Sequence, residues 1–191
     1  MTKSELLRLM RTKKLITRPA TPWKRNFFIE YGGICADPDV LSAVGTLLAD
    51  AISERTGSAT PLSQPDLITS RGIKATLLAQ AVIPHLARNG VGPVQLTWVD
   101  GDRMKPVIEP YTWQFKEGDK SLIVVMEIGA SKQLNEMLFA LSYHKVEAVG
   151  VVSLFNSNNS NLNHLHIPHV FSLFSKEQIV ELIEEEETVT T

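Results

Sequence analysis

The sequence predicts an α/β fold, in which helices cover both faces of a mostly parallel sheet, and three observations lead to this prediction. Short apolar segments alternate along the chain with longer segments that carry apolar residues at helical spacing. Residues 122–126 and 148–152 are uninterrupted apolar runs, as is typical of parallel strands buried on both faces. The chain has 191 residues and no internal repeat, which fits a single domain over residues 1–191.

Helical spacing is found in residues 4–14, 38–56, 73–88 and 131–144 and in the segment that follows Ser175. Asp37 is a good N-cap residue for the second of these helices, and Pro38 suits its first position. Ser175 and Gln178 have the spacing of a capping box at the start of the last helix. Pro84 is expected to kink or end the third helix, because proline lacks the N–H that a helix interior needs.

The strands are expected between these helices, at residues 67–69, 94–99, 107–115, 122–127, 146–154 and 167–173. The Asp100-Gly101 pair predicts a turn between the second and third of these strands. Residues 156–163 are rich in asparagine and predict a polar surface loop. The strands thus alternate with helices, as a parallel sheet requires.

Composition argues against a membrane protein, a disulfide scaffold and a disordered chain. There are 19 Lys and Arg residues against 21 Asp and Glu residues, and the net charge is −2. Cys35 is the only cysteine in the chain, so no internal disulfide or multi-cysteine metal site can form. No apolar run is long enough for a membrane span, and charges interrupt the apolar part of the N-terminus. We therefore expect a cytoplasmic protein.

Charge is distributed unevenly along the chain. Basic residues crowd the first 25 positions, and residues 184–191 are predicted to be an acidic, frayed tail. The basic segment would suit a phosphate-bearing ligand or nucleic acid, and the alternative is a solvated helix face. A net charge near zero argues against a dedicated nucleic-acid binder.

The order of segments resembles the orotate phosphoribosyltransferase family along nearly the whole chain. Residues 24–30 and the helix that opens at Asp37 resemble the N-terminal part of proteins in that family. This part forms a hood, which corresponds to residues 1–35 here. Residues 66–73 resemble its pyrophosphate-contacting strand and loop. Residues 116–125 resemble the lead-in to its phosphoribosyl pyrophosphate (PRPP) motif, and residues 147–152 and 167–175 resemble the two strands that follow.

This resemblance implies a type I phosphoribosyltransferase fold with a small N-terminal hood. The family joins orotate to PRPP with Mg²⁺, giving orotidine monophosphate and pyrophosphate. Its members are usually dimers in which a mobile loop of one subunit completes the site of the other. Such chemistry needs carboxylates for the ribose hydroxyls, backbone N–H groups for a phosphate and cations for the leaving pyrophosphate.

The predicted phosphate loop departs from the family pattern. The family places two adjacent acids after a buried strand, followed by a Thr/Gly-rich loop and a helix. Here Met126 stands at one acid position and only Glu127 remains. Ala130, Ser131, Lys132 and Gln133 replace the Thr/Gly-rich part. Gly129 and Ser131 keep a fragment of its anion-binding chemistry, so a weak anion site is expected in place of full PRPP recognition.

The other two ligand loops are altered as well. Where the family has a Gly-Pro-Ala-Tyr-Gly-Gly type turn, this chain has Ser70, Arg71 and Gly72. Gly72 is expected to keep the turn, and Arg71 either contacts phosphate or is a solvated loop residue. In the predicted catalytic loop, Arg103 and Lys105 are the candidates for the cationic catalytic role, because residues 100–106 contain no histidine.

Lys24, Phe27 and Phe28 match the family best. The resemblance implies that Lys24 is a cation on the phosphate side and that the two phenylalanines form a wall for the base. The open alternative is a strand with core aromatics. The histidines at residues 164–169 are interpreted as loop residues, so no metal site is expected.

Two main hypotheses follow from these residues. The first is an orotate phosphoribosyltransferase-like homodimer with lost or much reduced catalysis, which binds a nucleotide or phosphate ligand, senses it or acts as a scaffold. The alternative is a divergent active enzyme that uses Glu127, Ser131, Lys24 and either Arg103 or Lys105, with Mg²⁺. Nucleic-acid binding through the basic N-terminus is a third possibility, for which steep salt dependence is expected.

Overall fold

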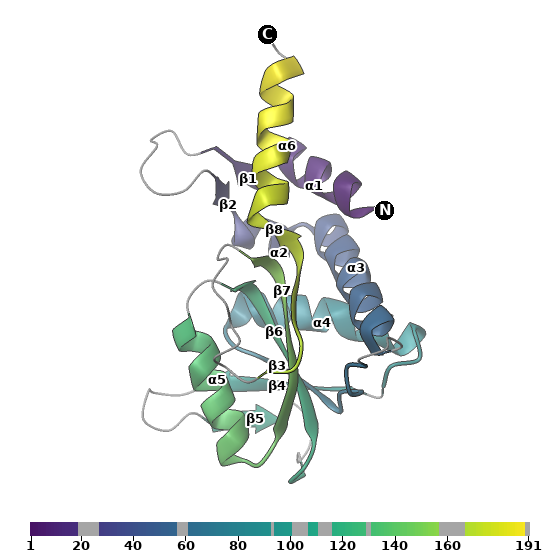
Figure 1. Ribbon diagram of the computed structural model, residues 1–191, viewed down its shortest axis with the longest axis vertical. Coiled ribbons are helices and arrows are strands. Elements are labelled where there is room, and N and C mark those ends of the chain that lie inside the picture. The colour runs from purple at the N-terminus through teal and green to yellow at the C-terminus, as the bar shows by residue number, and fades with distance from the viewer. Residues whose placement is uncertain are drawn as a thin grey trace.

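The computed structural model describes residues 1–18, 27–56, 61–92, 94–100, 107–110, 116–128, 131–156 and 167–189 (Figure 1). A six-stranded sheet has the order β5-β4-β3-β6-β7-β8. Its strands are β3 (Leu67–Ser70), β4 (Gln95–Asp100), β5 (Val107–Pro110), β6 (Lys120–Ile128), β7 (Glu147–Asn156) and β8 (Val170–Ser175). β5 is an antiparallel edge strand, and the other strands run parallel. The predicted mostly parallel α/β sheet is therefore confirmed.

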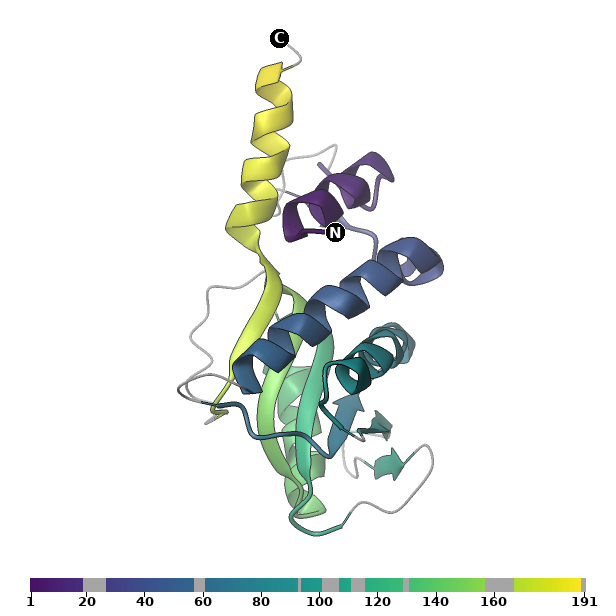
Figure 2. The same cartoon turned by 90° about the vertical axis from the view of Figure 1, so that its right-hand side faces the viewer.

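Helices cover both faces of this sheet, as the apolar strands require. α3 (Pro38–Thr56) and α4 (Ile73–Arg88) lie on one face, and α5 (Ser131–Tyr143) lies on the other (Figures 1 and 2). Successive side chains of β6 enter the two cores in turn, because the side chains of a strand alternate between its faces. Leu122 and Val124 belong to the larger core, and Ile123 belongs to the core beneath α5.

The expected helix over residues 73–88 matches α4, and it does not end at Pro84. The last strand begins at Val170, three residues later than expected. Pro168 has no backbone N–H to donate to a neighbouring strand, and the His169 carbonyl accepts a hydrogen bond from the Val151 N–H at 2.8 Å. Among the described residues, no helix is long and apolar enough to cross a membrane.

The N-terminal hood packs above the carboxyl ends of the parallel strands. It contains α1 (Lys3–Thr12), the antiparallel pair of β1 (Ile16–Thr17) and β2 (Phe28–Ile29), and α2 (Tyr31–Ala36). α2 is not predicted from the sequence, because it starts with Tyr-Gly-Gly and has few residues of high helix propensity. Apolar hood residues extend the larger core, and Leu6, Met10, Ile16 and Ile34 are fully buried.

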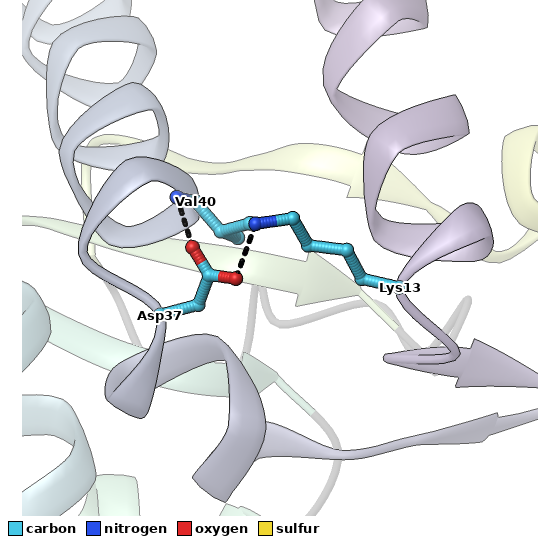
Figure 3. A network of polar contacts seen from close by, with 3 residues as sticks. All are labelled: Lys13, Asp37 and Val40. Atoms are coloured by element: carbon cyan, nitrogen blue, oxygen red, sulfur yellow. Dashed lines mark hydrogen bonds and ion pairs between the residues drawn. The ribbon is translucent and has the colours of Figure 1, made fainter.

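Asp37 joins the hood to α3 (Figure 3). Its Oδ1 accepts a hydrogen bond from the Val40 N–H at 3.1 Å, which confirms the predicted N-cap. Its Oδ2 accepts one from Lys13 Nζ at 2.5 Å. The Lys13 ammonium, with the Val40 N–H, lowers the pKa of the Asp37 carboxyl below its ordinary value.

The C-terminal helix α6 (Lys176–Val189) starts at the predicted capping box. The Ser175 N–H donates to Gln178 Oε1 at 2.9 Å, and the Gln178 N–H donates to Ser175 Oγ at 3.3 Å. Ile179 and Ile183 are buried near α1, and the rest of the helix projects beyond the body of the protein (Figure 2). Helical backbone therefore continues into the segment predicted to be an acidic tail.

Candidate functional site

The candidate site lies at the carboxyl ends of β3 and β6, beside the hood. In open parallel sheets, ligands bind outside the carboxyl ends of the strands. The two strands are neighbours in the sheet, with Ser70 opposite Val124, so the segments after both strands lie near one another. α4 starts just after β3 and α5 starts after β6, which brings two helix N-termini to this edge.

Glu127 is half-buried near the end of β6 and is bonded to the hood. Its Oε2 accepts a hydrogen bond from the Tyr31 hydroxyl at 2.5 Å. The Tyr31 ring also packs edge-on against Phe155, with ring centroids 6.0 Å apart. Phe155 lies opposite Glu127 on β7 and packs against Phe174 at 5.6 Å. An aromatic stack thus holds Tyr31 over the β6–β7 pair.

Arg71 follows β3 and forms an ion pair with Glu136 of α5. Both side chains are mostly covered, with 27% and 21% of their surfaces exposed. The Glu136 carboxylate offsets the charge of the guanidinium, so a phosphate that binds Arg71 would have to compete with this ion pair. Glu136 is not predicted as a site residue from the sequence, since nothing local distinguishes it from a solvated residue of an amphipathic helix.

Ser70 and Gly72 have structural tasks at the start of α4. Ser70 is fully buried, and its Oγ lies 3.0 Å from the Thr76 Oγ1. Gly72 has a φ of 77°, a conformation that favours glycine, and occupies the N-cap position of α4. The expected turn at Gly72 is therefore confirmed. No described atom lies within 4 Å of the place that a Cβ would take, so this turn faces open space.

The two candidate base-binding aromatics differ in exposure. Phe27 is 7% exposed and packs in the larger core, as the alternative interpretation has it. Phe28 is 53% exposed on β2, opposite Thr17. Of the pair, Phe28 is the ring that solvent or a ligand can reach.

Cys35 lies where the hood meets the first turn of α4. Its Sγ donates to the Lys74 carbonyl at 3.7 Å. Burial raises the pKa of the thiol, so Cys35 stays protonated at neutral pH. A protonated thiol with a backbone partner is unsuited to nucleophilic catalysis.

The remaining candidates fall outside the described residues, in whole or in part. Lys24, Arg103, Lys105, Gly129 and Ala130 are outside them, and so are the histidines at 164 and 166. The backbone of Ser131 begins α5, and its side chain is not described. Within the described ranges, no group of three or more His, Cys, Asp or Glu residues could hold a metal ion.

No protein-family model matches the sequence, and no curated protein sequence does either. Solved structures match with high coverage. Orotate phosphoribosyltransferase from Francisella tularensis superposes with a TM-score of 0.73 and 14% identity, over 95% of this chain and 90% of the other. The Mycobacterium tuberculosis orotate phosphoribosyltransferase in complex with PRPP superposes with a TM-score of 0.69 and 14% identity, over 93% of this chain and 98% of the other. This chain has the type I phosphoribosyltransferase fold.

Leishmania donovani UMP synthase also matches, with a TM-score of 0.76 and 16% identity. The match covers 98% of this chain and 39% of that longer one. Adenine phosphoribosyltransferase from Thermoanaerobacter pseudethanolicus has the same fold, with a TM-score of 0.60 and 17% identity. Within the type I phosphoribosyltransferase fold, the chain therefore has an architecture like that of the orotate enzymes. The identities are low, so these comparisons carry the fold and not the activity.

Proposed function

We propose that this chain is an orotate phosphoribosyltransferase-like protein with lost or much reduced catalysis, which binds a phosphorylated ribose ligand, such as a nucleotide, without turning it over. One observation carries the proposal. The charged candidate residues that the structure describes, Glu127 and Arg71, both have partners inside the protein.

Transfer from PRPP places specific demands on these two residues. A carboxylate must accept hydrogen bonds from ribose hydroxyls, and a cation must offset the charge of the leaving pyrophosphate. Glu127 is the described acid at the end of β6, and its carboxylate already accepts the Tyr31 hydroxyl. Arg71 is already neutralised by Glu136. Breaking a hydrogen bond to a charged group costs about 1.5–3 kcal/mol, which would weaken binding of the reacting groups.

The neighbouring position strengthens this argument. Met126 is half-buried and packs against the larger core, at the position where the family has its first acid. A thioether can accept only weak hydrogen bonds, so it cannot replace a carboxylate that binds sugar hydroxyls. The end of β6 therefore presents one carboxylate in place of an adjacent pair.

A divergent active enzyme is the second candidate function, and the Gly72 turn favours it. This turn has the positive φ that a close backbone approach to a diphosphate needs, and it faces open space. Under this alternative, Mg²⁺ would enter with the substrate phosphates and use Glu127 as its protein carboxylate.

Calorimetric titration with PRPP, orotate and orotidine monophosphate, each with Mg²⁺, tests the proposal alongside a turnover assay. Binding of the monophosphate without turnover supports it. PRPP binding with turnover overturns it in favour of the active enzyme, and no binding to any of the three would leave only a scaffold role. The variant Met126→Asp restores the second acid and separates the candidates: it is expected to raise the turnover of a weak enzyme and to leave a non-catalytic protein inactive.

A further inference from the structure

A hydrogen bond ties the hood to the acid at the end of β6. Its donor, the Tyr31 hydroxyl, is 96 residues away in sequence from its acceptor, Glu127 Oε2, and the two oxygens are 2.5 Å apart. An O–H···O⁻ bond of this length is of the strong, charge-assisted kind. The contact is part-buried, so water competes weakly for the carboxylate.

The phenol hydroxyl offers Glu127 what a sugar hydroxyl would offer it. Both groups are neutral O–H donors on a carbon framework, and a carboxylate accepts either with the same geometry. Because the Tyr31 ring rests against Phe155, the hydroxyl is held at the carboxylate without a ligand. A ribose hydroxyl that approaches Oε2 from the same side must therefore displace it.

The backbone of Tyr31 is held in place by the hood. Tyr31 is the first residue of α2, and Glu30 caps this helix by accepting the Gly32 N–H at 3.0 Å. In the next position, a Cβ on Gly33 would stand 2.5 Å from Leu15 Cδ2, so α2 is closely packed within the hood. Release of Tyr31 from Glu127 thus requires either rotation of its side chain away from Phe155 or movement of α2 with the hood.

We propose that Tyr31 is an internal competitor that sets the affinity of the site for ribose hydroxyls by occupying Glu127 in the absence of ligand. This inference rests on the proposed ribose-phosphate-binding function. When the competent state is only a fraction of the population, the apparent affinity falls by that fraction. Since the coupling is reciprocal, a ribose phosphate that takes Glu127 also weakens the hold of the sheet on the hood.

Titration with ribose 5-phosphate tests the competition in the full chain. Tyr31→Phe removes the hydroxyl and keeps the ring against Phe155, so it is expected to bind ribose 5-phosphate about tenfold more tightly than the wild type. Glu127→Gln is expected to lose the gain when combined with Tyr31→Phe. The matched control is Tyr143→Phe, which removes a phenol hydroxyl from a side chain that is 73% exposed on α5 and should leave the affinity unchanged.

A spectroscopic signal distinguishes competition from a general loosening of the fold. Displacement of a phenol from a carboxylate changes the near-ultraviolet absorption of tyrosine, so ribose 5-phosphate should produce a difference spectrum in the wild type that Tyr31→Phe lacks. If Tyr31→Phe binds no more tightly than the wild type, or not at all, the competition is refuted even when the wild type binds. Turnover of PRPP and orotate by the wild type would instead refute the loss of catalysis, while the comparison of affinities still decides the role of Tyr31.

Discussion

Replacement of Gly45 by alanine tests a close backbone contact between two helices on the larger core. Gly45 lies in α3 where this helix crosses α4. A Cβ at Gly45 would stand 2.5 Å from the carbonyl oxygen of Ala81 and 2.8 Å from its carbonyl carbon. An ordinary contact begins at 3.4 Å, so the helices would have to separate by about 1 Å. The obstacle is helix backbone, which cannot rotate aside as a side chain can.

Two opposing effects set the magnitude. Overpacking of a core costs about 1–3 kcal/mol, and a rigid backbone obstacle places this contact near the upper end. Alanine recovers about 1 kcal/mol over glycine in a helix interior. We therefore expect Gly45→Ala to lower the free energy of unfolding by about 2 kcal/mol, which corresponds to a melting temperature about 4–8 °C lower for a chain of this size.

Urea unfolding followed by far-ultraviolet circular dichroism measures this difference. The midpoint should fall while the slope with denaturant stays unchanged, because the exposed area on unfolding is the same. The control is Glu54→Ala, an exposed residue of the same helix, which should change the free energy of unfolding by less than about 0.5 kcal/mol. A Gly45→Ala protein more stable than the wild type by its helix propensity alone would show that α3 and α4 are not in backbone contact.

Three further predictions concern polar and backbone features. Lys13 lowers the pKa of the Asp37 carboxyl, so the Asp37 carboxylate stabilises the folded state above its ordinary pKa. This stabilisation is lost as the carboxylate protonates in acid. Asp37→Asn should therefore melt at a lower temperature than the wild type at pH 7, and the two melting temperatures should converge as the pH falls below about 4. The buried Thr69 hydroxyl forms hydrogen bonds with hydroxyls on β4 and β6, at 2.7 and 2.6 Å. Thr69→Val should therefore lower the free energy of unfolding, measured in urea, by about 2 kcal/mol. An unchanged urea midpoint would contradict these hydrogen bonds. Lys14 has a φ of 58°, which asparagine adopts more readily, so Lys14→Asn should raise the free energy of unfolding by about 0.5 kcal/mol and raise the melting temperature slightly. A melting temperature below that of the wild type would argue against this backbone conformation.

Local chemistry made much of the architecture predictable from the sequence. The α4 helix was placed correctly because its apolar residues recur at helical spacing and Gly72 supplies the turn before it. Asp37 and Ser175 were identified as caps because capping depends on residues three positions apart. β6 and β7 could be assigned as parallel strands because they are apolar on both faces.

The candidate site was less accessible to the same reasoning. Its positions could be proposed from their order along the chain, but their state depends on partners far away in sequence. The pairing of Glu136 with Arg71 joins residues that are 65 positions apart in sequence, and it depends on how α5 packs against the sheet. α2 was missed because its glycines give no helical signal, and Tyr31 was missed with it.

The sequence alone thus determined the α/β class, the caps and the Gly72 turn, since each depends on neighbouring residues or on periodicity. Only the tertiary structure decided that Glu127 and Arg71 are already paired. The physical reason is that a hydrogen bond or ion pair depends on distance in space, and the packing of the hood and α5 against the sheet sets that distance. The sequence does not show whether a carboxylate or guanidinium is already paired with another side chain of the same protein.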